Sequence, residues 1–397
     1  MKILQYISVP DITAAGGSER VFCEMANALT ARGHEVYAVC NTPQKDRPFY
    51  TLDGNVRFVN LDASGQRRTK PLSWKILYHG LRPISKGMWN RYVEDPFNEK
   101  QGEPLAKFIQ EVQPDVVILY SVIEYFSLLR QPMLDVPVIL MHHYNTRELT
   151  KHLNTPNRVA KINTCPHIQV LQHSFALEIQ KIYHGPIHVI PNVVPQIAEK
   201  DLADLTIEKP QKTITMISRL SPKKQQHMLI QAFGRLAKHY PDWKVEIYGS
   251  SHKQRHLRRL ERMIASLGLA DRVKLMGMTN HPLDVLRQSD IFAFPSDFPE
   301  GWGLVLTEAM AVGLPCVGLK TTSSVNELIV DGVNGFLTDN TPEDFAEKLK
   351  ILMDDQNLRA KMGRAGHEMM KQYAPEKVLD QWEELIDKVV RQHRNIG

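Results

Sequence analysis

Short runs of β-branched and other apolar residues alternate with segments of helical periodicity along most of the chain, and this alternation constrains the fold more than any other feature. Strands that are separated by helical segments return by crossover connections, so they lie parallel and the helices cover both faces of the sheet. The runs are residues 3–9, 36–39, 56–61, 116–121, 138–141, 168–171 and 187–190, then 213–217, 244–248, 273–276, 291–295, 315–318 and 335–337. The sequence therefore predicts an α/β protein with two Rossmann-like, doubly wound domains.

The two series of strands are separated by a polar stretch without a long apolar segment. The chain has 397 residues, which is enough for two domains at about 150 residues each. We expect a first domain over 1–195, a linker over 196–211 and a second domain over 212–373. The periodicity beyond residue 341 is helical throughout, and 374–397 is expected to form a helix that crosses back to the first domain.

Composition and charge are those of an ordinary globular protein, with 43% hydrophobic and 23% charged residues. A net charge of +5 is too small for a chain of this length to indicate a nucleic-acid partner, and we expect none. The four cysteines, Cys23, Cys40, Cys165 and Cys316, are far apart and form neither a zinc motif nor a disulfide framework. No apolar stretch reaches the roughly 20 residues that span a bilayer. These features favour a cytoplasmic protein whose membrane contact is peripheral, at the inner face of the cytoplasmic membrane.

The loops that follow strands are the candidate ligand-binding segments, because ligands of open α/β sheets bind beyond the carboxyl ends of the strands. In the first domain, Gly16 and Gly17 precede a helix and allow a backbone to approach an oxygen closely. The alternative is a simple tight turn before a helix N-cap at Ser18. The loop lacks the Gly-x-Gly-x-x-Gly pattern, so a nicotinamide cofactor is not supported.

Two cations follow the first strand of the second domain. Arg219 can bind a phosphate with two hydrogen bonds, and Lys224 supplies a point charge. Gly249 follows the next strand, in another loop of small residues. The alternative interpretation is a solvated cluster of surface charges.

The most informative stretch is residues 295–311, in which two glutamates flank a glycine-rich turn. A helix is predicted to start near Leu304, so that its first free N–H groups point toward whatever Glu300 faces. Glu308 is unusual because it lies inside an apolar helix, where the alternative is a partly exposed surface glutamate. Carboxylates accept hydrogen bonds from hydroxyls, so a sugar and a ribose on either side of a pyrophosphate would use each part of this arrangement.

Taken together, these motifs resemble the retaining glycosyltransferase family 4, of the GT-B fold, over nearly the whole chain. The resemblance rests on the stretch 16–20, Arg219 with Lys224, the two glutamates with residues 309–315 after them, and residues 331–336. It implies two Rossmann-like domains that face a central cleft, with the acceptor bound by the first domain and a nucleotide-sugar donor by the second.

The resemblance also implies a role for each matching residue. Arg219 and Lys224 would hold the diphosphate, together with the amides of Gly303, Leu304 and Val305. By the same resemblance, Glu300 would bind the donor sugar, Glu308 the ribose, Gly17 the diphosphate near the reacting centre, and His143 the transferred sugar. Gly16 and Gly249 are predicted from their loops to bind the same nucleotide sugar. His142 stands beside His143, so the sequence leaves open which of the two faces the site.

The family needs no metal ion, and the sequence contains no Asp-x-Asp motif to hold one; we expect no cofactor besides the UDP-sugar co-substrate. The predicted catalytic residues are Glu300, His143, Arg219 and Lys224. The resulting hypothesis is transfer of a hexose or an N-acetylhexosamine from a UDP-sugar to a saccharide of the bacterial envelope, such as lipopolysaccharide, capsule or a lipid-linked oligosaccharide. The alternatives are a nucleotide-sugar epimerase of the same fold and a subunit that binds sugar nucleotides without turnover.

A basic, aromatic segment over 66–92 sets the first domain apart. It has no acidic residue but carries seven cations, interleaved with Trp74, Tyr78, Trp89 and Tyr92. Cations with interfacial aromatic side chains suit an anionic membrane surface, so we expect peripheral membrane contact here, beside a lipid-linked or envelope acceptor. The alternative is a solvated helix and loop.

Overall fold

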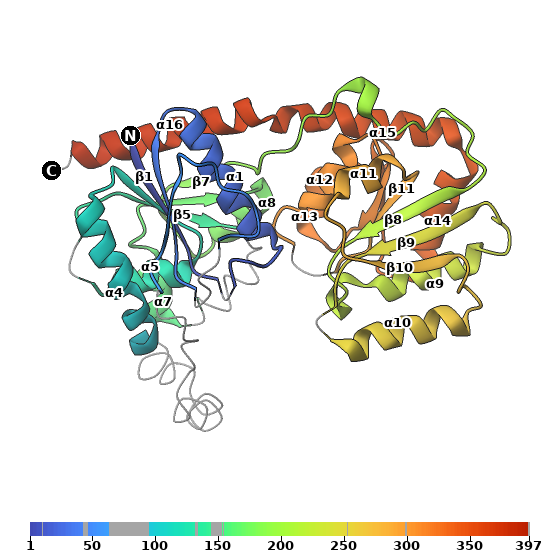
Figure 1. Ribbon diagram of the computed structural model, residues 1–397, viewed down its shortest axis with the longest axis horizontal. Helices are drawn as coiled ribbons and strands as arrows, with labels where there is room; N and C mark the ends of the chain where they lie inside the picture. Colours follow the sequence, from blue (N-terminus) through green and yellow to red (C-terminus); the bar gives the residue numbers. More distant parts are fainter. Residues whose placement is uncertain are drawn as a thin grey trace. The chain divides into compact units, whose positions relative to one another are not determined.

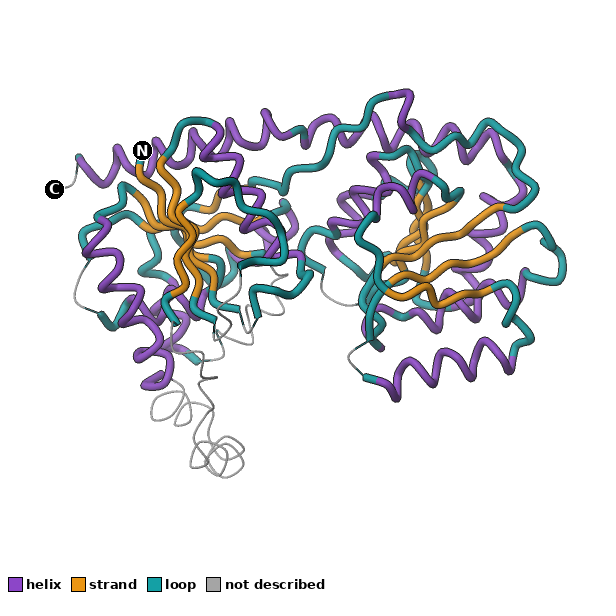
Figure 2. Tube along the Cα trace, viewed as in Figure 1, coloured by secondary structure: helices purple, strands orange, loops and turns teal. Residues whose placement is uncertain are grey.

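The computed structural model describes residues 1–9, 11–42, 47–62, 95–131, 134–143, 153, 155–251, 253–297 and 300–395. The chain forms two compact units, and each is described by itself. One unit contains Met1–Pro191 and Val378–Gly397, and the other contains Asn192–Lys377. Helices cover both faces of a central sheet in each unit (Figures 1 and 2).

The sheet of the first unit has seven parallel strands in the order β3-β2-β1-β4-β5-β6-β7. The strands are β1 (Lys2–Ile7), β2 (Glu35–Cys40), β3 (Arg57–Asn60), β4 (Val116–Leu119), β5 (Val138–His142), β6 (His167–Val170) and β7 (Ile187–Val189). Its helices are α1 (Gly17–Ala31), α4 (Asp95–Val112), α5 (Val122–Leu128), α7 (Pro156–Ile162) and α8 (His173–Ile179). The central strand β4 is buried along its whole length, as expected for a continuous apolar run between two helical layers.

The sheet of the second unit has six parallel strands in the order β10-β9-β8-β11-β12-β13. The strands are β8 (Lys212–Ile217), β9 (Trp243–Tyr248), β10 (Val273–Gly277), β11 (Ile291–Phe294), β12 (Cys316–Leu319) and β13 (Gly335–Thr338). The α-helices are α9 (Gln226–Leu236), α10 (Gln254–Ser266), α11 (Pro282–Arg287), α12 (Leu304–Ala311), α13 (Ser323–Leu328), α14 (Pro342–Asp354) and α15 (Gln356–Met370). Three short 3-10 helices are η2 (Glu199–Asp201), η3 (Pro222–Lys224) and η4 (Lys371–Tyr373).

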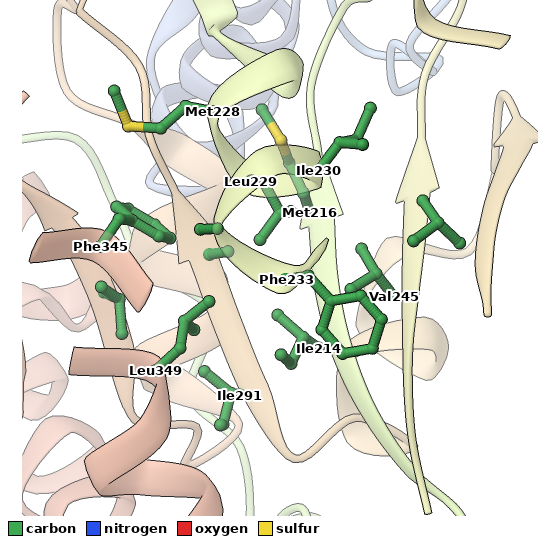
Figure 3. Close-up of a cluster of buried hydrophobic side chains, with 14 of the residues drawn as sticks. Ile214, Met216, Met228, Leu229, Ile230, Phe233, Val245, Ile291, Phe345 and Leu349 are labelled. Carbon is green, nitrogen blue, oxygen red and sulfur yellow. The ribbon is translucent and has the colours of Figure 1, made fainter. Parts of the chain in front are cut away.

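The core of the second unit lies between its sheet and the helices α9 and α14 (Figure 3). Ile214 and Met216 of β8 pack there with Phe233 of α9 and Phe345 of α14, and all four are almost fully buried. Burying a side chain of this size contributes roughly 1.5–3 kcal/mol. This packing holds β8 firmly, so the loop that leaves its carboxyl end starts from a fixed point.

The last helix, α16 (Pro375–Arg394), has a buried stripe at helical spacing that includes Trp382 and Ile386. From Val378 onward it groups with the first unit, where Arg32, the C-cap of α1, forms ion pairs with Asp380 and Glu383. The predicted fold class, with two parallel sheets and a helical C-terminal tail, is confirmed.

Candidate active site

The second unit has a topological switch point between β8 and β11. These strands are neighbours in the sheet, but the chain leaves β8 toward β9 and β10 on one side and leaves β11 toward β12 and β13 on the other. A crevice forms at such a point beyond the carboxyl ends of the strands, and it is the usual ligand site of open α/β sheets. The loop after β8 carries Arg219 and Lys224, and the loop after β11 carries Glu300 and Gly303. The strand order therefore brings together segments that are far apart in the sequence.

An ion pair joins the two loops at the switch point. The ammonium of Lys224 binds Oε1 of Glu300, and the hydroxyl of Ser296 donates to the same oxygen at 2.6 Å. The side chains of Lys224 and Glu300 are only 14% and 12% exposed. Both bonds fall on Oε1, and among the described residues Oε2 of Glu300 has no hydrogen-bond partner. The carboxylate is thus held in place and retains an oxygen that can accept from a ligand hydroxyl.

The N-terminus of α12 adds hydrogen-bond donors beside this pair. Gly303 is the N-cap with φ of 73°, a left-handed conformation that glycine adopts without strain, and the helix begins at Leu304 as predicted. The carbonyl of Gly303 accepts from the N–H groups of Leu306 and Thr307. The N–H groups of Leu304 and Val305 precede the first helical hydrogen bonds, and the helix dipole makes this end favourable for an anion.

Glu308 occupies the second turn of α12 and is 2% exposed. The alternative of a partly exposed surface glutamate is therefore wrong. Burying a carboxylate is costly unless other groups bind it, so a residue of this kind inside an apolar helix is a candidate for a binding role.

Gly249 follows β9 and lies against the loop after β8. Its φ is 147°, and a Cβ at this position would lie 1.8 Å from the backbone oxygen of Ser218. The loops after β8 and β9 run together here, because the Ser218 N–H donates to Tyr248 and the Leu220 N–H donates to Ser250. Only glycine fits this close approach. Arg219 follows Ser218 and is exposed, so it is available to a ligand in solution.

The first unit has its own switch point, between β1 and β4. The loop after β1 leads to Gly16, which is the N-cap of α1 without a side-chain cap, and the helix begins at Gly17. The predicted alternative, an N-cap at Ser18, is wrong, because the chain is already helical there. The exposed Gly17 amide is one of the first-turn donors of α1.

His143 follows β5, the next strand along from β4. Its ring lies 5.6 Å from that of Tyr120, between centroids, and is 7% exposed. Burial, with a smaller contribution from the charge of His142, lowers the pKa of His143 to about 3. The ring is therefore neutral at physiological pH, and among the described residues its Nε2 has no hydrogen-bond partner. His142 is also buried, so exposure does not distinguish the two.

Sequence reasoning missed one buried carboxylate at this end of the sheet, Glu124. It accepts backbone hydrogen bonds from Ser8 at 2.5 Å, Tyr120 at 2.8 Å and Ser121 at 2.9 Å, and so ties the end of β4 to the residue after β1. Burial raises its pKa to about 8, although these donors act in the opposite direction. The signal was present in the sequence, since Ser121 and Glu124 form a capping box at the start of α5.

One group of possible metal ligands occurs among the described residues, formed by Glu199, His367 and Glu368. Its ligand atoms lie within 4.8 Å of one another, and Nδ1 of His367 is 2.8 Å from the carbonyl oxygen of Ala311. Lys371 already contacts both carboxylates. None of these residues belongs to the predicted site. Among the described residues, no helix is long and apolar enough to cross a membrane, and the basic, aromatic segment 66–92 lies outside them.

Comparison with known proteins identifies both halves of the chain. Residues 15–196 match the family model described as Glycosyltransferase Family 4, and residues 198–369 match the model described as Glycosyl transferases group 1. An uncharacterized glycosyltransferase of Haemophilus influenzae is 28% identical over 95% of this chain and 98% of the relative. An exopolysaccharide phosphotransferase of Streptomyces coelicolor is 35% identical over 94% of this chain, which spans 40% of that relative.

Solved structures show the same fold. The crystal structure of Anabaena HepE in complex with UDP and glucose superposes with a TM-score of 0.71 at 20% identity and covers 98% of this chain and 99% of that one. The two family models together leave only the chain ends and residue 197 unmatched. The parallel sheets, the structural neighbours and the two family models agree, and the chain therefore belongs to the family-4-like glycosyltransferases of the GT-B fold.

Proposed function

We propose that this glycosyltransferase transfers a hexose or an N-acetylhexosamine from a UDP-sugar, with retention of configuration and without a metal ion. The acceptor is a saccharide of the bacterial envelope, and the reaction takes place at the inner face of the cytoplasmic membrane. The observation that supports the proposal most strongly is the Lys224–Glu300 ion pair. It joins the loops after β8 and β11 at the switch point of the second unit.

The leaving diphosphate needs positive charge, because its negative charge grows as the bond to the sugar breaks. Lys224 and Arg219 provide two cations after β8, and the free amides of Leu304 and Val305 add the positive end of a helix dipole. Groups that are fixed before the reaction stabilise the transition state without having to reorganise. In this proposal they take the role that a divalent cation has in metal-dependent enzymes.

The two glutamates bind the hydroxyl groups on either side of the diphosphate. Glu300 is fixed through Oε1 and offers Oε2 to the donor sugar, whereas the buried Glu308 accepts hydrogen bonds from the ribose. A hydrogen bond to a charged group contributes about 1.5–3 kcal/mol. Gly249 lets the loop after β9 lie against the loop that carries Arg219, since any side chain at this position would collide with the backbone of Ser218.

The first unit contributes the acceptor side. Its proposed binding groups are the amides at Gly16 and Gly17, for the diphosphate side of the reacting centre, and His143, for the transferred sugar. A neutral imidazole can donate or accept a hydrogen bond with a hydroxyl group, and its low pKa keeps it neutral throughout the physiological range.

Two similar proteins support the proposed donor class and the proposed acceptor class. HepE was crystallised with UDP and glucose, which supports UDP-sugar as the donor class. The Streptomyces relative is named for exopolysaccharide, which supports an envelope acceptor.

The test is release of UDP in the presence of EDTA from a panel of UDP-sugars, with and without a lipid or oligosaccharide fraction of the host envelope. We expect release that depends on the acceptor and prefers one donor. Conversion of the sugar without an acceptor would indicate an epimerase instead, and binding without release would indicate a subunit without turnover. A requirement for a divalent metal would contradict the metal-independent mechanism.

A further inference from the structure

Helix α10 presents a face made of arginines. The helix begins after the loop that follows β9, and in Figure 1 it lies along the lower edge of the second unit, below α9 and the edge strand β10. Four arginines, Arg255, Arg258, Arg259 and Arg262, are all exposed. At about 100° per residue they fall within an arc of about 100°, and the first and last are separated by about 10 Å along the axis. We call this set the arginine face.

The centre of the arginine face lies about 150° around α10 from the side that packs on the domain. The buried residues of the helix are His256, Leu260 and Ile264, at the spacing of one helical stripe. The apolar side is thus used by the fold, and the arginines lie on the exposed side of the helix.

The charges of the arginine face are not neutralised by the protein. None of the four arginines forms an ion pair within the described residues, and the single acidic residue of the helix, Glu261, pairs with none of them. Other surface helices of the unit differ, since Lys350 pairs with Asp354 on α14 and Lys371 pairs with Glu368 at the end of α15. Four guanidinium groups therefore share one surface, and no carboxylate among the described residues neutralises their charge.

We propose that the arginine face binds the anionic surface of a lipid bilayer. Guanidinium groups bind phosphate with two hydrogen bonds, and clusters of four to eight cations on a helix are suited to anionic headgroups. The outer face of a single helix is convex, so it can lie against a plane along its whole length.

The role of this contact rests on the proposed function: it would hold the second unit at the membrane where the acceptor is made. The contact itself does not depend on that function. It is separate from the basic, aromatic segment 66–92 of the other unit, and it needs no turnover. Its failure and the failure of the proposed function can therefore be told apart, because binding to vesicles and release of UDP are measured independently.

The experiment is co-sedimentation of the full chain with vesicles of equal parts phosphatidylglycerol and phosphatidylcholine, compared with pure phosphatidylcholine. We expect binding to the anionic vesicles only, and its loss when salt is raised from about 0.1 M to about 1 M, because the Debye length falls from about 10 Å to about 3 Å. The test variant is R258E/R259E. The matched control is K361E/R364E, which makes the same change of charge on exposed positions of α15.

The variant on α10 should lose affinity for anionic vesicles by at least about tenfold, given that each cation near the surface contributes about 1 kcal/mol. The control should bind within about twofold of the natural chain, a change well below that of a single cation. Equal losses in the two variants, or none in R258E/R259E, would overturn the assignment to α10. Binding of soluble polyphosphate but not of vesicles would overturn the membrane as the partner.

Discussion

Replacement of Lys224 by alanine tests the proposed donor site most sharply, because the residue forms a buried ion pair and is proposed to bind the leaving diphosphate. Its ammonium pairs with Glu300 at a place where both side chains are about seven-eighths buried. Breaking a buried pair costs about 3–5 kcal/mol, and an exposed pair is worth about 0–1 kcal/mol. For this intermediate burial we expect Lys224→Ala to lower the free energy of unfolding by about 2 kcal/mol. The unfolding transition of the second unit would then fall by about 4–8 °C.

The effect on turnover should be larger than the effect on folding. Loss of one fixed group that stabilises developing negative charge lowers kcat by about 100- to 1,000-fold. A stability loss of about 2 kcal/mol leaves nearly all molecules folded at 25 °C, because typical stabilities are about 5–15 kcal/mol. The loss of kcat would therefore report on the chemistry.

The assay is UDP release at saturating donor together with thermal unfolding of the same preparation. Lys223→Ala is the matched control, because Lys223 is the exposed neighbour in η3, whereas Lys224 is the lysine that binds Glu300. We expect the control to keep its activity and its unfolding temperature. The reasoning is refuted if Lys224→Ala is as active as Lys223→Ala, or if its activity falls only in proportion to the unfolded fraction.

Further predictions concern binding, backbone and pH. Glu308→Gln should weaken UDP binding by about tenfold or more, since it replaces charged by neutral hydrogen bonds, and should leave the unfolding temperature nearly unchanged; calorimetric titration checks this. Gly249→Ala should destabilise the second unit by more than about 2 kcal/mol, because the new Cβ collides with Ser218, whereas Gly268→Ala, at a φ of 66° with open space around it, should cost only about 1 kcal/mol. The free energies of unfolding of the two variants, measured with denaturant, separate the cost of the steric collision from the cost of backbone strain alone. The pKa of Glu124 in the folded protein is raised to about 8, so the folded protein binds a proton here more tightly than the unfolded chain does. The free energy of unfolding should therefore fall as the pH rises from about 5 to 8, by up to about 1.4 kcal/mol per pH unit. Urea unfolding at several pH values should show a smaller fall in Glu124→Gln, and parallel curves would contradict the shift.

The strands could be predicted from the sequence because parallel strands buried on both faces are continuous apolar runs. The predicted run 291–295 is the observed strand Ile291–Phe294, and the run 335–337 is Gly335–Thr338. The helix that starts at Leu304 was also predictable, since Gly301 and Gly303 precede it in the sequence and a mostly apolar stretch follows. In such cases the local sequence and the fold favour the same structure.

Contacts between distant residues could not be predicted from spacing. Lys224 and Glu300 are 76 positions apart, and they meet because β8 and β11 are neighbours in the sheet, a fact that depends on the strand order. Glu124 was missed for a related reason. Its capping box with Ser121 is local, but its bond to the Ser8 N–H requires β1 and β4 to lie side by side.

The start of α1 differs from its predicted alternative for a local reason. A serine beside two glycines is a common N-cap signal, yet here Gly16 takes the extended conformation of the cap and Ser18 is inside the first turn. Gly16 offers no side-chain cap to the first amides of α1, and the carboxylate of Glu19 lies beside it.

The central claim is that the second unit holds the diphosphate of a nucleotide sugar with its own cations and amides. The most direct test is calorimetric titration of UDP in the presence of EDTA, with the natural chain, Lys224→Ala and Glu308→Gln. We predict binding of UDP to the natural chain without a divalent cation, and affinities at least about tenfold weaker in both variants. Binding that appears only when a divalent metal is added, or that is unchanged in both variants, would contradict it.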